Sequence, residues 1–271
     1  MSRTHAYDAV FAAIKQLPKT LQVASAGILF MAIDSLPMDN TRHLRFLSAI
    51  NLINSHPVDV RYTMVDQLQE SIWCQPSFEA KLHCLDEFLM VLRSQPAIER
   101  QRAYGVLYDA SFDTYEDSSR FAMLRTIARE VTQLPQAEQP ELLICAAHLA
   151  REIKAPYIAF LYNDIVQAIS ALPPDTRDDT LGKIARHLEH VVNSLIYYGN
   201  PNGELPALFH AVLGTIDVLP EVMQVALLAQ LKQSLTLCPA GSLADASTAI
   251  SKKMNVLPLY LIEQFLDLKP A

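Results

Sequence analysis

Several residues of this 271-residue chain belong to types that can do chemistry, beginning with a histidine pair. His187 and His190 stand three positions apart, a spacing that places two imidazoles on one face of a helix. A zinc site needs further ligands, and the chain has neither a His-Glu-x-x-His sequence nor paired cysteines at metal-binding spacing. We therefore expect these histidines to be exposed or to cap a helix, and we predict no metal site.

Nucleophilic catalysis by a thiol requires a cysteine and a histidine that face each other. His83 and Cys84 are neighbours in the chain, and neighbouring side chains on a helix point in different directions. A Cys–His pair therefore needs a partner from elsewhere in the fold, which the sequence does not identify. The four cysteines, Cys74, Cys84, Cys145 and Cys238, are expected to be buried free thiols in a reducing compartment.

Four carboxylates lie close together in the middle of the chain: Asp109, Asp113, Glu116 and Asp117. Such a cluster can bind a divalent ion or a basic partner. The run 113–117 resembles the acidic helices of isoprenoid synthases, but those enzymes need a second acidic motif facing the same cavity, and Asp178-Asp179 is the other candidate. We expect a solvated turn with acids at a helix start. No phosphate-binding glycine loop or nucleophile elbow is present, so we predict no catalytic residue and no cofactor.

A regular series of prolines marks the elements that carry these residues. Between Pro18 and Pro96 successive X-Pro steps fall 19 or 20 residues apart. Later members of the series are Leu134-Pro135, Ala155-Pro156, Leu172-Pro173, Leu219-Pro220, Cys238-Pro239 and Leu257-Pro258. Proline fits the first turn of a helix and disfavours helical backbone in the residue before it. The spacing therefore predicts helices of about 15 residues joined by short connections.

Apolar residues recur inside the units with helical spacing. The stripes are Leu21, Ala24, Ile28, Met31 and Leu36, then Leu44, Leu47, Ile50 and Ile53, then Val65, Leu68 and Ile72. Helices this short are marginal alone, so we expect the stripes to be buried against neighbours. Short connections make consecutive helices antiparallel. The sequence thus predicts one all-α domain over residues 1–271, a right-handed α-solenoid of about fourteen helices.

The segment His56-Pro57-Val58-Asp59-Val60-Arg61 resembles the start of the second helix of a HEAT repeat. The same Pro-x-x-x-Arg spacing recurs at Arg100 and Arg177, while Arg42 follows Pro37 one residue late. Other units carry Gln22, Ala80, Gln139 or Gln224 at this position. HEAT and armadillo proteins are curved α-solenoids that bind macromolecules along a concave face. The resemblance implies such a fold and a structural ladder in which Arg61, Arg100 and Arg177 pair with acids such as Asp59, Glu99 or Asp175.

The repeat is irregular at about residues 186–206. Pro173 and Pro220 are 47 residues apart, about eight more than two units need. We expect a helix to Tyr198, the loop Gly199-Asn200-Pro201-Asn202-Gly203, and a short helix from about 206 to 218. Insertions in a solenoid often mark a binding feature. Tyr197, Tyr198, Asn200 and Asn202 are therefore candidate partner contacts; the alternative is a tolerated insertion with one tyrosine packed inward.

Composition narrows the class of protein. Hydrophobic residues make up 51% and charged residues 19%, which excludes intrinsic disorder. The net charge of −7 and the absence of a basic run argue against nucleic-acid binding. The longest apolar stretch, residues 21–33, is too short to span a bilayer. We expect a soluble cytoplasmic protein, or alternatively one exported by a non-classical secretion system.

These observations predict a non-enzymatic helical-repeat scaffold that binds a protein or peptide along its concave surface. Two alternatives stay open. The Leu-Pro-bounded units are similar to repeat segments of bacterial secreted effectors, which implies an effector acting on a host protein. The other alternative is an enzyme or ligand-binding protein with a cavity between repeats, built on the acidic cluster or on His187 and His190. The apolar last helix, from about 258 to 268, is a candidate surface for self-association.

Overall fold

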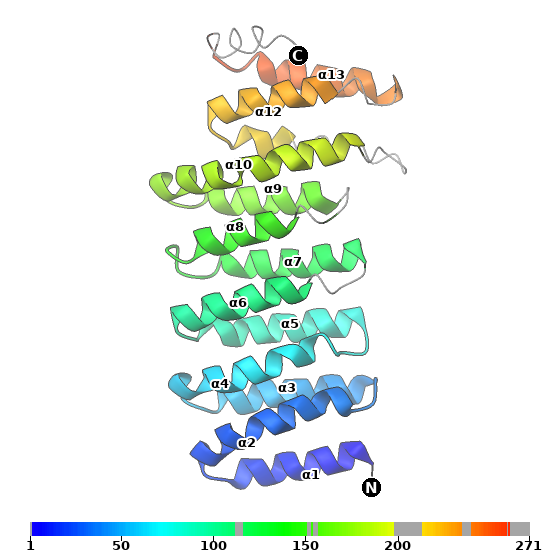
Figure 1. Ribbon diagram of the computed structural model, residues 1–271, viewed down its shortest axis with the longest axis vertical. Coiled ribbons are helices and arrows are strands. Elements are labelled where there is room, and N and C mark those ends of the chain that lie inside the picture. Colours follow the sequence, from blue (N-terminus) through cyan, green and yellow to red (C-terminus); the bar gives the residue numbers. More distant parts are fainter. Residues whose placement is uncertain are drawn as a thin grey trace. The chain divides into compact units, whose positions relative to one another are not determined.

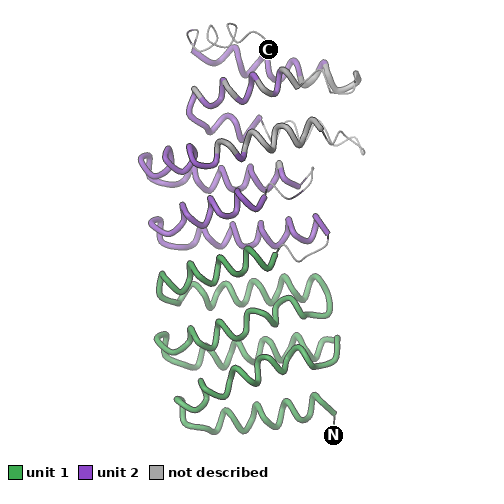
Figure 2. Tube along the Cα trace, viewed as in Figure 1, with its two compact units in different colours: residues 1–115 green, residues 116–271 purple. Residues whose placement is uncertain are grey.

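The computed structural model describes residues 2–111, 116–150, 153, 157–197, 213–234, 240–258 and 260. Every regular element within these residues is a helix, and none of them lies in a strand. The predicted all-α class is confirmed. Contacts divide the chain into two compact units, Met1–Tyr115 and Glu116–Ala271 (Figure 2). A single continuous solenoid domain over residues 1–271 stays a prediction.

Unit 1 is built from short helices that follow one another in chain order (Figure 1). Its elements are α1 (Arg3–Gln16), α2 (Lys19–Met31), η1 (Ala32–Ser35), α3 (Asn40–Asn54), α4 (Val58–Leu68), η2 (Gln69–Ile72), α5 (Phe78–Arg93) and α6 (Ala97–Ser111). Neighbouring helices pack in the pairs α1–α2, α3–α4, α4–α5 and α5–α6, and η1 packs on both α2 and α3. In addition, α2 packs on α4 and α3 packs on α5. Contacts between alternate helices build one shared core rather than a chain of separate hairpins.

Unit 2 has the same kind of packing. Its elements are α7 (Asp117–Val131), α8 (Gln139–Ala150), α9 (Tyr157–Ser170), α10 (Pro174–Tyr197), α12 (Glu221–Ser234) and α13 (Ala240–Met254), and residues 213–217 are also helical. Helix α9 packs on α7, α8 and α10, and α10 also packs on α8 and α12. The long helix expected after Pro173 is confirmed, because α10 spans 24 residues and ends at Tyr197.

The proline series marks the helix ends as the sequence predicts. Leu36, His56, Gln95 and Leu172 each precede a proline, and each is buried. The backbone N–H of each donates to the carbonyl three residues earlier, which closes the last turn of the preceding helix. A buried residue before the proline therefore anchors every one of these four turns.

The predicted apolar stripes are correct after Pro57, where Val65, Leu68 and Ile72 are fully buried. They are wrong in part on α2 and α3, because Leu21, Ile28, Met31 and Leu44 are exposed. The buried apolar side chains of α2 are instead Ala26, Leu29 and Phe30. Helix α2 is apolar on more than one side, so spacing alone does not select the buried face. Packing on α1 and α4 makes that selection.

Candidate functional site

An apolar groove lies between α1 and α2. Its volume is about 620 Å³, within the usual range for ligand-binding pockets. The lining residues are Arg3, Ala6, Tyr7, Val10, Ile14, Ala24, Ser25, Ile28, Leu29, Ala32, Ser35 and Leu36. Tyr7 and Leu29 are buried within it, whereas Val10 and Ile28 are exposed by 51% and 74%. The groove thus joins a closed apolar floor to accessible apolar edges.

Few polar groups line this groove. Arg3 donates to the carbonyl of Ser35, at 3.2 Å, and keeps further donors for another partner. The hydroxyl of Tyr7 is buried and has no hydrogen-bond partner among the described residues. Burial raises the pKa of Tyr7 well above its usual value, so the phenol is protonated and able to donate. The groove therefore suits an apolar segment that brings a hydrogen-bond acceptor to Arg3.

The apolar face of α2 is not repeated on α4. Pro18 and Pro57 are 39 residues apart, so Ile28 and Met31 correspond to Gln67 and Glu70. The exposed face of α2 is thus apolar where the equivalent positions of α4 are polar. Exposed apolar patches on soluble proteins commonly mark interaction sites.

A second feature of unit 1 is a chain of contacts between α3 and α5. The Sγ of Cys84 lies 3.3 Å from Nδ1 of His43, and Nε2 of His43 lies 2.9 Å from Nδ1 of His83. Nε2 of His83 lies 3.7 Å from a carboxylate oxygen of Glu87. Sequence reasoning noted His83 and Cys84 but missed His43, which stands about forty residues away. Only the packing of α3 on α5 reveals it.

This arrangement does not make Cys84 a nucleophile. Cys84 is fully buried, and burial followed by the charge of Glu87 raises the pKa of its thiol far above the usual value. Burial, followed by the neighbouring His83, lowers the pKa of His43. A protonated, inaccessible thiol lacks the thiolate character that reactive cysteines need. The expectation of a buried free thiol holds for Cys84. Cys74 and Cys145 form no disulfide and are partly buried, and Cys238 lies outside the described residues.

In the predicted arginine ladder, the guanidinium of Arg61 bonds to backbone carbonyls. Its Nε donates to the carbonyl of His56, at 2.7 Å, and a terminal nitrogen donates to that of Asn54, at 2.9 Å. Arg61 thus bonds to the end of α3 instead of the expected carboxylate of Asp59. The last carbonyls of a helix have no partner inside that helix, so these bonds satisfy groups that the helix leaves open.

The same bonds recur at other turns between helices. Arg100 donates to the carbonyls of Arg93 and Gln95, and Gln22, Gln139 and Gln224 donate to carbonyls five and seven residues earlier. Arg42, one residue late, reaches the carbonyls of Asp34 and Leu36 and also that of Cys74. We call Gln22, Arg42, Arg61, Arg100, Gln139 and Gln224 the carbonyl ladder. Arg177 differs, because its Nε lies 2.9 Å from a carboxylate oxygen of its neighbour Asp178.

The side chains of the four candidate partner contacts at the irregular segment lie outside those that the structure describes. Tyr197 is the last residue of α10, and Tyr198, Asn200 and Asn202 lie outside the described residues. Most of the last predicted helix, 258–268, also lies outside them. Of the predicted pair His187 and His190, His187 meets His148 of α8 edge to face, with ring centroids 5.3 Å apart, and the side chain of His190 lies outside the described ones.

Two acidic residues of these motifs, Asp117 and Asp179, have basic partners three or four residues later. Asp117 opens α7 and lies 3.7 Å from Arg120, and Asp179 lies 2.8 Å from Lys183. Asp113 lies outside the described residues. Within the described part of the chain, no group of three or more histidine, cysteine or acidic side chains is placed to hold a metal ion. The same residues include no helix that is both long and apolar enough to cross a membrane.

Comparison with protein-family models, with curated proteins and with solved structures finds no match for this chain.

Proposed function

We propose that this chain is a HEAT-like, right-handed α-solenoid that acts as a binding scaffold, and that the groove between α1 and α2 receives an amphipathic helix of a protein partner. The observation that carries the proposal is the groove of about 620 Å³ with exposed apolar edges. It is a surface for association rather than for chemistry.

Two features of the helices support the solenoid. Contacts of α2 with α4 and of α3 with α5 are those of stacked helix pairs. The carbonyl ladder repeats similar bonds at six turns between helices, so these turns are held in a similar way. Helical-repeat proteins of this kind present extended surfaces to macromolecular partners.

The chemistry of the groove argues for the occupant. A groove between two helices accepts the ridge of a third, with apolar side chains at positions i, i+3 or i+4, and i+7. Val10 and Ile28 provide apolar contacts at the edges, and the buried Tyr7 belongs to the apolar floor. Arg3 supplies a positive charge among the lining residues, so an acidic residue at one end of the partner helix is favoured.

The test is selection of helical peptides from a displayed library against the full chain, followed by affinity measurement with three proteins. These are the wild type, Ile28→Asp, and the control Met90→Asp. Met90 is 52% exposed on α5 and does not line the groove. We expect Ile28→Asp to weaken binding at least tenfold, because a carboxylate would be desolvated beneath the peptide, and Met90→Asp to leave it unchanged.

The outcome that overturns the proposal is equally clear. If the selected peptides bind Ile28→Asp as tightly as the wild type, the groove is not the binding surface. Circular dichroism of both variants verifies that each retains its helices, so a loss of binding cannot be assigned to unfolding.

A further inference from the structure

Two imidazole nitrogens from different helices meet at the surface of unit 1. Nε2 of His43, on α3, lies 2.9 Å from Nδ1 of His83, on α5. The side chain of His83 is 51% exposed, so the meeting point is open to solvent. The contact is tertiary, because the packing of α3 on α5 holds the two rings together.

A further group lies near the outer nitrogen of each ring. The Sγ of Cys84 lies 3.3 Å from Nδ1 of His43, within hydrogen-bond distance, and a carboxylate oxygen of Glu87 lies 3.7 Å from Nε2 of His83, at the distance of an ion pair. A neutral imidazole carries one proton, and the surroundings of each nitrogen decide which nitrogen holds it. With the protons on the outer nitrogens, both inner nitrogens keep a lone pair for a metal ion, at a separation of 2.9 Å.

We propose that His43 and His83 together bind one divalent transition-metal ion, and that Cys84 and Glu87 hold the two rings in place. Metal-binding histidines characteristically donate their second N–H to a carboxylate or another acceptor, which fixes the tautomer and orients the ring. Cys84 occupies that position beside His43, and Glu87 places a negative charge 3.7 Å from the outer nitrogen of His83. This inference is independent of peptide binding at the groove.

The two imidazoles indicate the class of metal. Imidazole nitrogens bind divalent transition-metal ions at about 2.0–2.1 Å. The inner nitrogens are 2.9 Å apart, close enough for one ion to reach both. Among the divalent first-row ions, Cu²⁺ binds most tightly to a given nitrogen site, so copper is the expected ion.

Water completes the coordination. The described residues offer no third side chain placed as a ligand, and the sulfur of the buried Cys84 faces the outer nitrogen of His43. The proton balance is simple. The hydrogen shared between the inner nitrogens moves to an outer nitrogen when the metal binds, so two neutral rings release no net proton.

The experiment is titration of the full chain with Cu²⁺, followed by calorimetry and by electron paramagnetic resonance. We expect one equivalent bound by nitrogen ligands in the wild type. His43→Ala and His83→Ala should each weaken that site at least tenfold. Glu87→Gln should weaken it less than either histidine variant, because it removes only a negative charge 3.7 Å from the outer nitrogen of His83. The control is His5→Ala, because His5 lies on α1 and bonds to Ser2 at 2.8 Å.

The proposal is overturned if the His43→Ala/His83→Ala double variant binds Cu²⁺ as tightly as the wild type. It is also overturned if His5→Ala causes as large a loss, which would place the copper elsewhere. Thermal unfolding of each metal-free variant shows whether the helices persist, and His83→Ala removes an exposed side chain that the fold does not need for its core.

Discussion

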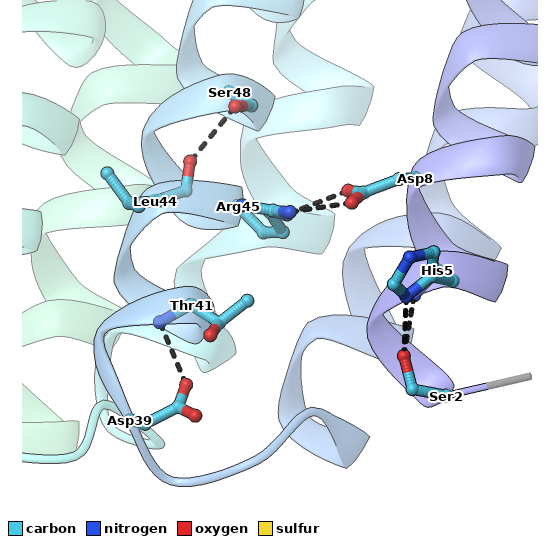
Figure 3. Close-up of polar contacts among 8 residues, drawn as sticks. All are labelled: Ser2, His5, Asp8, Asp39, Thr41, Leu44, Arg45 and Ser48. Carbon is cyan, nitrogen blue, oxygen red and sulfur yellow. Dashed lines mark hydrogen bonds and ion pairs between the residues drawn. The ribbon is translucent and has the colours of Figure 1, made fainter.

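Arg45 and Asp8 form a bidentate ion pair between α3 and α1. Nε of Arg45 lies 2.8 Å from one carboxylate oxygen of Asp8, and a terminal nitrogen lies 2.6 Å from the other (Figure 3). The pair spans from the first helix to the third, so α1 is fixed by more than its turn to α2. Paired, parallel bonds of this kind also fix the relative orientation of the two side chains.

The Asp8–Arg45 pair is partly exposed, which limits its contribution to stability. We expect Asp8→Ala to lower the free energy of unfolding by about 1 kcal/mol or less, with a smaller effect at high salt. Urea denaturation of Asp8→Ala, Arg45→Ala and the double variant gives the coupling energy. A coupling that does not decrease with added salt would contradict an electrostatic origin.

The carbonyl ladder makes a prediction about residue type. Arg61→Ala should destabilise the chain by about 1–3 kcal/mol, because carbonyls at the end of α3 lose their donors. Arg61→Gln should recover most of that loss, since Gln22, Gln139 and Gln224 make the same bonds at other turns between helices. The measurement is urea denaturation of both variants. Equal losses in Ala and Gln would mean that charge, not carbonyl bonding, is what matters.

Asp39 caps the start of α3, where its carboxylate accepts from the N–H of Thr41 at 2.8 Å. Hydrogen bonds from Thr41, through its side chain and then its backbone, hold the pKa of Asp39 below its usual value. The cap therefore stabilises the fold above the unfolded pKa of about 3.9, and this stability is lost as pH falls through the lower folded pKa. Carboxyl NMR titration measures the shift. Asp39→Asn keeps an acceptor but should lose this pH dependence.

Cys84 should resist modification in the folded chain. It is fully buried, and the raised pKa keeps its thiol protonated at neutral pH. We expect Ellman's reagent to label Cys84 only after denaturation, whereas the partly buried Cys74 and Cys145 should react sooner. Mass spectrometry of peptides from native and denatured samples assigns each site. Rapid labelling of Cys84 in the native chain would show that α3 and α5 separate readily.

Local sequence determines much of this fold. Proline has a fixed backbone angle and no N–H, so the helix ends at Leu36, His56, Gln95 and Leu172 can be read from the chain alone. The Pro-x-x-x-Arg spacing also marks a structural position correctly. The bonding partner of Arg61 differs from the prediction. The sequence suggests a carboxylate partner and does not show that the end of α3 presents open carbonyls.

Burial and side-chain proximity depend on neighbours that sequence does not reveal. Ile28 and Met31 of α2 are predicted to be buried but are exposed. The several apolar faces of α2 are equivalent until α1 and α4 pack against one of them. The meeting of His43 with His83 and Cys84 likewise arises from two helices far apart in the chain. The sequence by itself determined where helices begin and end, because backbone geometry is local. Only the tertiary structure decided which side chains meet and which faces stay open, because those depend on packing between distant segments.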